Sequence, residues 1–167
     1  MKKAINKELN NQNKINKRST ARLIAVQALY QYYFYEQERD LDILKKELLD
    51  NYLLSEEREE ESYHGKIDKG LLQKLTSNVI TLIPEIDREI SEFLQGQWSL
   101  EKLPDISLQI IRVANLELKL AKDTPVKVIL NEYVDIAACF YDSQKVTFVN
   151  SILESLAKKN RPDEFKK

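Results

Sequence analysis

The sequence has few of the residues that interrupt helices and few of those that build disulfides or catalytic sites. Its 167 residues include three Gly, four Pro, one Cys and one His. Because Pro and Gly are the main breakers of regular structure, their scarcity favours long helices. The single Cys139 excludes an internal disulfide, which agrees with a reducing compartment. Its neighbours Ala137, Ala138 and Phe140 are apolar, so we expect a buried structural thiol rather than a reactive one.

Long hydrophobic runs are also missing. No apolar stretch approaches the roughly 18 to 20 residues that span a bilayer. The Lys- and Asn-rich start lacks the apolar segment of a signal peptide. Hydrophobic residues make up 43% and charged residues 32% of the chain, which is enough apolar material for a core. These features predict a cytoplasmic protein that does not associate with membranes.

The residue patterns of common catalytic sites are absent as well. There is no Gly-rich phosphate loop and no Cys/His cluster. The one histidine, His64, lies in a charged segment without a second ligand nearby in sequence, so we expect an exposed imidazole rather than a metal site. A Ser or Cys nucleophile needs a base within hydrogen-bond reach, and a single loop histidine is a poor supplier. The residues predict that the protein is not an enzyme and uses no metal or cofactor.

Charge is present in abundance but is unevenly distributed. Residues 1–22 hold seven basic residues and one acidic residue, a net charge of +6. The whole chain carries −1, which leaves −7 on the remaining 145 residues. A basic arm on an acidic body is expected of a protein that binds a polyanion. We expect a basic, partly disordered arm over 1–17, one helical RNA-binding domain of two sub-bundles over 18–160, and a polar tail over 161–167.

Hydrophobic residues recur at helical spacing along most of the chain. This spacing predicts about seven helices, which begin near residues 18, 41, 67, 85, 105, 125 and 143. The first is expected to end near Glu38, and the charged run 55–65 is interpreted as a solvated loop. Pro84 is expected to break or kink the third helix, which separates it from the fourth. Short connections imply antiparallel neighbours, so we predict an all-α fold of two packed antiparallel bundles.

Residues near the helix boundaries give further expectations. Thr124-Pro125 is expected to start a helix, with the threonine as its cap and the proline at its first position. Phe140 is expected to be buried by that helix, and Asp142 to cap the last one. Three polar residues within apolar helices are interpreted as structural: Asn131, Glu132 and Asn150. Two more are expected to belong to structural ion pairs: Arg112 and Glu117.

Two features near the start of the chain point to RNA. Lys14, Arg18 and Arg22 are four residues apart, so they share one stripe if helical structure extends back to Lys14. Cations on an exposed helix edge neutralise phosphates and release counterions. Five aromatic residues then fall within six positions: Tyr30, Tyr32, Tyr33, Phe34 and Tyr35. They cannot all enter one core, and an exposed ring can stack on a base. The alternative is that Tyr30, Tyr33 and Phe34 are core residues, while Tyr32 and Tyr35 cover a neighbouring helix.

Four segments together resemble the NusB family. In chain order they are AVQALYQ (25–31), IIRVANLEL (110–118), PVKVILNEYVDIA (125–137) and FVNSIL (148–153). The resemblance extends from Arg18 to about Lys159 and is weakest over 40–69. It implies an all-helical RNA-binding fold of two small bundles. It also implies binding of boxA-type single-stranded RNA together with NusE, a small-subunit ribosomal protein, in RNA polymerase antitermination complexes that support ribosomal RNA transcription.

The same resemblance implies which residues contact RNA. The arginine-rich arm of the family corresponds to Lys17, Arg18 and Arg22, and the aromatic residue after AVQAL corresponds to Tyr30. The RNA-facing turn before the last helix corresponds to Gln144, Lys145 and Phe148. The sequence departs from the family at Ser19 and Thr20, which interrupt the arm, and at Thr147 and Ser151, where a basic residue and a glycine are common.

Two other interpretations remain open. A stand-alone relative of the N-terminal RNA-binding domain of ribosomal RNA cytosine methyltransferases would have the same fold, but no methyltransferase domain follows Lys167. An acidic helical protein-interaction module would instead bind a basic partner through its body, without binding RNA. Salt-dependent binding to single-stranded RNA would separate this last interpretation from the first.

Overall fold

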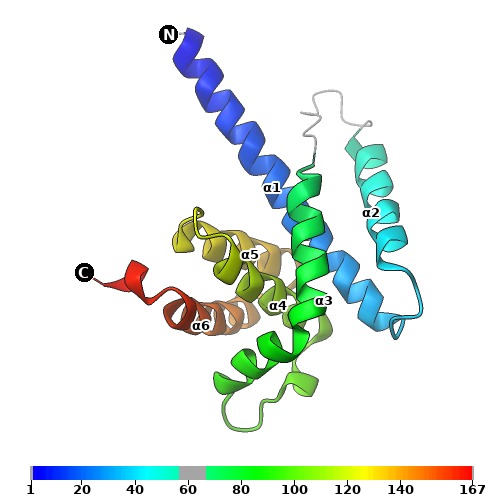
Figure 1. Ribbon diagram of the computed structural model, residues 1–167, viewed down its shortest axis with the longest axis vertical. Coiled ribbons are helices and arrows are strands. Elements are labelled where there is room, and N and C mark those ends of the chain that lie inside the picture. The colour runs from blue at the N-terminus through cyan, green and yellow to red at the C-terminus, as the bar shows by residue number, and fades with distance from the viewer. Residues whose placement is uncertain (1, 57–66, 167) are drawn as a thin grey trace. The chain divides into compact units, whose positions relative to one another are not determined.

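All regular secondary structure in residues 2–56 and 67–166, the part that this computed structural model describes, is helical (Figure 1). Side chains are described for 17–52, 67–104 and 106–166. Within these limits there are six α-helices and two short 3-10 helices, close to the seven predicted. The chain forms two compact units, Met1–Lys74 and Leu75–Lys167. The predicted all-α fold class is confirmed.

The first unit contains α1 (Lys2–Phe34) and α2 (Leu41–Glu56), which pack against each other (Figure 1). The helix α1 begins before the predicted Arg18 and ends before the predicted Glu38, so both predicted boundaries are wrong. Small and aliphatic side chains at helical spacing form most of its buried face: Ala21, Ile24, Ala25, Ala28 and Leu29. The Thr20 and Tyr52 hydroxyls lie 3.4 Å apart and connect the two helices.

The turn after Phe34 explains why α1 ends there. The Gln37 N–H donates to the Tyr32 carbonyl at 2.8 Å, and the Glu36 N–H donates to the Tyr33 carbonyl at 3.0 Å. These two bonds form a Schellman motif, which needs a left-handed residue after the helix. Glu36 takes that conformation with φ 52°, although glycine is usual there. Backbone hydrogen bonds therefore end α1 without a glycine in the sequence to signal it.

The helix α3 (Lys69–Glu92) begins in the first unit and continues in the second. It contains Pro84, where we predicted a boundary between two helices, so these two predicted helices are one. Proline removes a single backbone hydrogen bond from a helix interior. Because Pro84 is exposed, water can satisfy the carbonyl group that loses its partner. The helix therefore continues past the proline, so of the two predicted outcomes, a break or a kink, the break is wrong.

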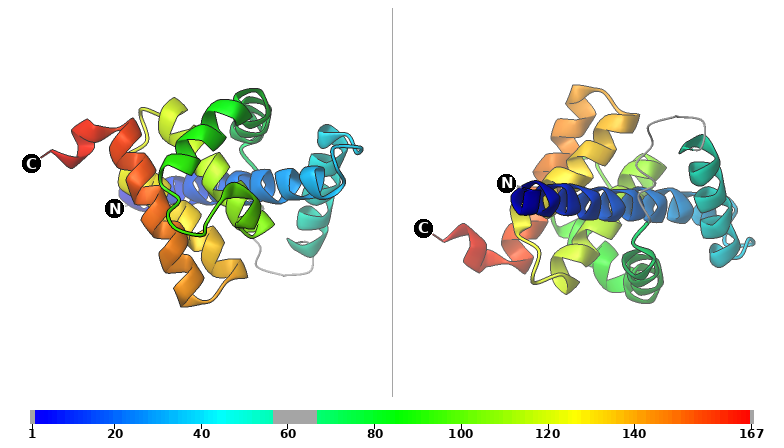
Figure 2. Two further views of the ribbon diagram at one scale, coloured as in Figure 1. Left: turned by 90° about the horizontal axis from the view of Figure 1, so that it is seen from below. Right: turned by 90° about the horizontal axis from the view of Figure 1, so that it is seen from above.

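The second unit is built around α4 (Asp105–Leu120). All residues from 109 to 118 are buried, including charged and polar ones. A helix that is covered on every side belongs in the middle of a bundle. The helices α5 (Val126–Phe140) and α6 (Ser143–Asn160) pack against α4 and against each other (Figure 2).

The ends of α5 and α6 test the boundary predictions. The predicted cap of α5 at Thr124 is wrong: Pro125 is the N-cap residue, and no side chain caps the helix from that position. Instead, the Val126 N–H donates at 2.9 Å to the carboxylate of Glu164 in the 3-10 helix Pro162–Phe165. The predicted cap of α6 is confirmed, because the Asp142 carboxylate accepts the Lys145 N–H at 3.0 Å. Phe140, the last residue of α5, is exposed rather than buried.

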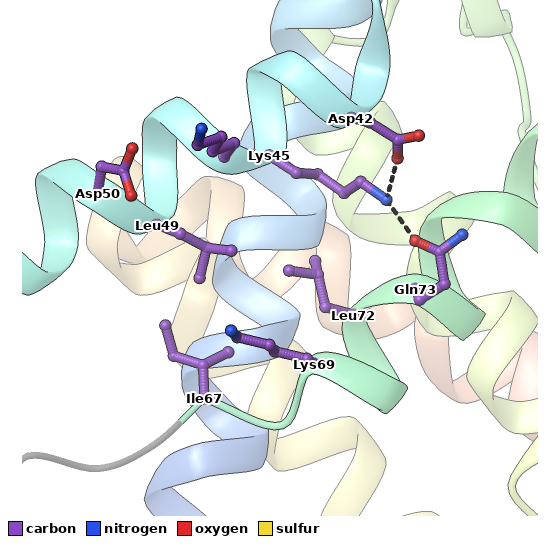
Figure 3. A pocket seen from close by; sticks show the side chains of 9 residues that line it. Asp42, Lys45, Leu49, Asp50, Ile67, Lys69, Leu72 and Gln73 are labelled. Carbon is purple, nitrogen blue, oxygen red and sulfur yellow. Dashed lines mark hydrogen bonds and ion pairs between the residues drawn. The ribbon is translucent and has the colours of Figure 1, made fainter.

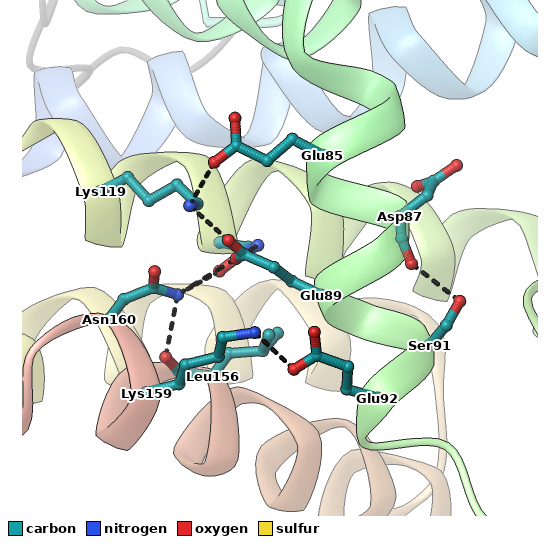
Figure 4. A network of polar contacts seen from close by, with 10 residues as sticks. Glu85, Asp87, Glu89, Ser91, Glu92, Lys119, Leu156, Lys159 and Asn160 are labelled. Atoms are coloured by element: carbon teal, nitrogen blue, oxygen red, sulfur yellow. Dashed lines mark hydrogen bonds and ion pairs between the residues drawn. The ribbon is translucent and has the colours of Figure 1, made fainter.

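A polar network joins α3, α4 and α6 within the second unit (Figure 4). The Lys119 ammonium lies 2.5 Å from Glu89 Oε1 and 2.8 Å from Glu85 Oε1. The Asn115 amide donates to Glu89 Oε2 at 2.9 Å, and the Asn160 amide donates to Asn115 Oδ1 at 2.8 Å. Each buried polar group of this network therefore has a partner, as burial requires.

The network decides the charge state of its members. Burial alone would raise the pKa of Glu89, but hydrogen bonds from Lys119 and Asn115 and the charge of Lys119 outweigh it, so the pKa is lowered. Burial would likewise lower the pKa of Lys119, but hydrogen bonds to Glu85 and Glu89 and their charges raise it. Both groups are therefore ionised at neutral pH.

Candidate nucleic-acid interface

Three residues that the sequence implicates in RNA contact lie together in the second unit. Gln144, Lys145 and Phe148 line one pocket of about 430 Å³, together with Trp98 and residues at the start of α4. The Phe148 ring lies beside the Trp98 ring, with their centroids 5.1 Å apart and their planes tilted by 36°. An open pocket with two adjacent rings and a nearby cation offers both stacking and charge to a single-stranded nucleic acid.

The start of α6 positions its three residues. The Asp142 cap fixes the first turn, which carries Gln144 and Lys145. Phe148 follows Gln144 by four residues, so both lie on the same face of the helix. Lys145 is exposed, and its ammonium lies 5.1 Å from the centre of the Tyr141 ring. This cation–π contact orients the lysine without neutralising its charge.

The pocket also borders the N-terminal ends of two helices. Pro104 and Ser107 belong to the start of α4, and Asp142 to the start of α6. The Tyr141 hydroxyl accepts the Ser107 N–H at 3.2 Å and thereby ties the two starts together. Helix N-termini carry partial positive charge, which is favourable near phosphates.

Replacing Asp142 by Ala is expected to lower the free energy of unfolding by about 1 kcal/mol, because the α6 cap is lost. Asp142→Asn is the matched control, since asparagine also caps a helix but carries no charge. Its free energy of unfolding should fall by only a few tenths of a kcal/mol. Urea unfolding of the two variants measures the difference. Equal destabilisation by Ala and Asn would contradict the capping role.

The three basic residues of α1 whose side chains the structure describes are not fully exposed. Lys17 and Arg18 are half-buried, whereas the Arg22 residue is 2% exposed. The expectation that Arg22 belongs to an exposed stripe is therefore wrong. Helical spacing gives the direction of a side chain around the helix but not what covers it. The side chain of Lys14 lies outside the described residues, as does His64.

The aromatic cluster at the end of α1 is divided between partial burial and exposure. Tyr30, Tyr32 and Tyr33 are half-buried, while Phe34 is 63% exposed and Tyr35 is also exposed. The Tyr30 and Phe34 rings lie 6.0 Å apart, one turn from each other. The alternative that made Phe34 a core residue is wrong, since it projects at the helix end beyond the buried face.

The residues interpreted as structural have different surroundings. Arg112 makes two hydrogen bonds to Asp87, at 2.8 Å from Nε and 2.7 Å from Nη2. Glu117 is buried and accepts the Tyr133 hydroxyl at 2.6 Å. Glu132 and Asn150 are half-buried, but Asn131 is exposed. Asn131 therefore lacks the burial that its interpretation as a structural residue implies.

Cys139 contradicts its prediction. It is exposed, with its thiol 3.4 Å from the Asp135 carbonyl one turn earlier. Asp135 is exposed as well, so Cys139 continues the outer face of α5.

Among the described residues, no group of three or more His, Cys, Asp or Glu is placed to hold a metal ion. No described helix is long and apolar enough to cross a membrane.

The first unit has its own hollow of about 510 Å³ between α2 and the start of α3 (Figure 3). The Lys45 ammonium donates to Gln73 Oε1 at 2.7 Å and pairs with Asp42 at 2.7 Å. The rest of the lining is mixed, with three apolar residues, Leu49, Ile67 and Leu72, and three charged residues, Lys46, Asp50 and Lys69. No residue that the sequence implicates in RNA binding lines this hollow.

Trp98 is the residue of the pocket that sequence analysis missed. It is the single tryptophan of the chain and is 41% exposed. A signal was present, because a large apolar residue follows Gly96 and precedes Ser99 in a segment without helical spacing. Its nearness to Phe148, fifty positions later, depends on the packing of α4 and α6 and has no local signature.

The regular structure of the described part is helical, α1 carries a basic stretch, and an exposed tryptophan lies beside a half-buried phenylalanine and a lysine. This arrangement is expected of a helical RNA-binding protein. The comparison with known families makes this specific. The model of the NusB family matches residues 19–158, and the chain belongs to this family. The family resemblance in the sequence is thereby confirmed.

Individual relatives agree with this. The chain is 36% identical over 152 residues to the transcription antitermination protein NusB of Bartonella tribocorum, covering 87% of this chain and 91% of the relative. It is 34% identical to that of a Bradyrhizobium species, covering 92% and 89%. Among solved structures, T. maritima NusB has a TM-score of 0.71 at 28% identity, covering 89% and 96%. A chain from the crystal structure of a plectonemic RNA supercoil has a TM-score of 0.68 at 24% identity, a likeness that shows the fold alone.

Proposed function

We propose that this protein is a transcription antitermination factor that binds boxA-type single-stranded RNA, together with a NusE-type ribosomal protein, and supports transcription of ribosomal RNA. It acts in the cytoplasm as part of an RNA polymerase antitermination complex and is not an enzyme. Its relatives are named transcription antitermination proteins. The observation that carries the proposal is the pocket that unites Phe148, Lys145 and Gln144 at the start of α6.

The proposed contacts divide into two kinds. Lys17 and Arg18 on α1, with Lys14 before them, meet phosphates, because long cationic side chains on a helix edge reach the backbone before a base edge. Lys145 adds a cation at the pocket. Phe148, and Tyr30 at the end of AVQAL, supply rings for stacking. Arg22 is a poor phosphate contact in this scheme because it is buried.

A basic ribosomal protein suits the charge of the body. The residues after position 22 carry a net charge of −7, which attracts a positively charged partner and raises the rate of encounter more than the affinity. Since α4 is buried from 109 to 118, a NusE-type partner that binds near α4 would contact the helices that cover α4 and not α4 itself.

An electrophoretic shift with boxA-like and scrambled RNA, with and without the NusE-type partner, tests the proposal. We expect a shift that prefers boxA-like RNA and strengthens when the partner is added. Gel filtration of the two proteins at micromolar concentration should give one joint peak. Two separate peaks would contradict a complex with the NusE-type partner. The absence of a shift with any RNA would favour the protein-interaction module instead.

A further inference from the structure

We propose that Trp98 is a stacking platform for one unpaired base of the bound RNA, with Phe148 as the ring that supports it. The inference rests on the proposed RNA binding and adds a residue and a mode of contact to it. Trp98 precedes α4, outside the motifs that carry the family resemblance.

The exposure of Trp98 is the first observation. The residue is 41% exposed and lies beside two hollows: the pocket with Phe148, and a second of about 340 Å³ lined by Ser91, Leu94 and residues 99–101. What distinguishes Trp98 from the other exposed aromatic residues is that a second ring, Phe148, lies beside it in a pocket, and such a pair offers a flat apolar face on which a base can stack. An indole is the largest ring a protein can offer to a base.

The segment around Trp98 is held in place, so the ring is pre-organised. Gly96 turns the chain with φ 65°, and the Trp98 N–H donates to the Gln95 carbonyl at 3.3 Å. The Lys102 ammonium donates to the Gln97 carbonyl at 2.9 Å, and Leu103 is buried. A platform whose backbone is already fixed loses less conformational entropy on binding.

The ring geometry decides where a base can go. Stacked bases lie about 3.4 Å apart, so a base between two rings needs roughly twice that spacing. The Trp98 and Phe148 centroids are 5.1 Å apart, which is an offset contact between the rings themselves. A base therefore stacks on the outer face of the pair, and Phe148 backs the indole.

The two side-chain charges at the pocket indicate where the phosphate of a bound nucleotide lies. The Asp142 carboxylate lines the same pocket and repels a phosphate, while the Lys145 ammonium attracts one. Lys145 is held over Tyr141, with the ammonium 5.1 Å from the ring centre. The phosphate of the bound nucleotide is thus expected on the lysine side, with its base over Trp98.

Because the chain has one tryptophan, emission excited at wavelengths that indole absorbs and tyrosine does not reports on Trp98 alone. The experiment titrates the full-length protein with boxA-like RNA and follows both tryptophan emission and the anisotropy of a label on the RNA. We expect quenching with the same midpoint as the anisotropy change. In a series of RNAs with one abasic site each, a single position should abolish the quenching.

Trp98→Leu supplies the second measurement. It should weaken binding about 5-fold to 150-fold, the equivalent of one stacked base, and leave the salt dependence unchanged. Phe165→Leu is the matched control, because Phe165 is a similarly exposed aromatic residue in the same unit, and it should bind as the unmodified protein does. Thermal melting checks that both variants fold. The fluorescence measurement uses the unmodified protein, so it tests the proposal even if a variant does not fold.

The outcomes separate the two proposals. RNA binding by anisotropy without quenching, or quenching that no abasic position abolishes, would overturn the role of Trp98 and leave the proposed function intact. An unchanged affinity of Trp98→Leu would do the same. No anisotropy change with any RNA would overturn the proposed function itself.

Discussion

Replacing Lys119 by Met is expected to lower the free energy of unfolding by about 3 to 5 kcal/mol, the cost of leaving a buried charge without its partner. The side chain of Glu89 is 8% exposed and that of Lys119 is 19% exposed. Removing the ammonium leaves the Glu89 carboxylate with its amide partners only. Urea unfolding of the full chain at neutral pH measures the loss.

Lys159→Met is the matched control for Lys119→Met. Lys159 also pairs with a glutamate of α3, Glu92, but the two side chains are 35% and 47% exposed. Exposed ion pairs contribute about 0 to 1 kcal/mol, so this variant should remain close to the unmodified protein. Equal losses in the two variants would contradict the structural role of the buried network.

The pH dependence follows from the direction of the Glu89 shift. The folded protein holds the pKa of Glu89 below its ordinary value of 4.5, so the folded state binds this proton less readily than the unfolded state. The stabilisation that ionised Glu89 contributes to the folded protein is complete above pH 4.5. It is lost as the pH falls through the lower pKa that Glu89 has in the folded protein. The difference between the unmodified protein and Lys119→Met should therefore narrow in acid. If the difference in free energy of unfolding between the two proteins stays constant down to acid pH, the lowered pKa of Glu89 is contradicted.

Replacing Lys17 and Arg18 together by Ala is expected to weaken RNA binding about 25-fold at 0.1 M salt. Each phosphate contact with a single strand adds about 0.7 to the slope of log affinity against log salt, which is about fivefold per contact at that salt. All RNA sequences should be weakened alike, because phosphate contacts carry no sequence information. Electrophoretic shifts with boxA-like and scrambled RNA measure both effects.

The control for this variant removes the same charge elsewhere. Lys122 and Lys127 are exposed in the second unit and lie outside the pocket, so their double replacement by Ala should change affinity little. Arg22 is left intact in both variants, because it is buried and its removal would test folding rather than binding. Weakening by both double variants to the same degree would indicate a general charge effect and contradict the α1 contacts.

The helices could be predicted well from the sequence because apolar spacing is a local property. The starts of α4 and α6 agree with the prediction, since Pro104 and Asp142 signal them directly. Features that depend on distant residues could not be predicted. The α5 cap, for example, comes from Glu164. The end of α1 was missed for another reason: its backbone motif at Glu36 is local, but it has no glycine to signal it.

Part of the candidate site could be predicted because three of its residues are neighbours in the sequence. The family resemblance brought together Gln144, Lys145 and Phe148, which are neighbours in sequence and line one pocket. Trp98 was missed because only tertiary packing places it at Phe148. Arg22 was expected to be exposed because helical spacing identifies a stripe without identifying its cover.

The salt dependence of RNA affinity tests the central claim most directly. Affinity for boxA-like RNA is measured over a range of salt concentrations for the unmodified protein and for the Lys17→Ala, Arg18→Ala double variant. We predict that log affinity falls linearly with log salt and that the double variant flattens the slope by about 1.4, two single-strand increments. Identical affinity and identical slope in the two proteins would contradict the account, as would the absence of RNA binding by the unmodified protein.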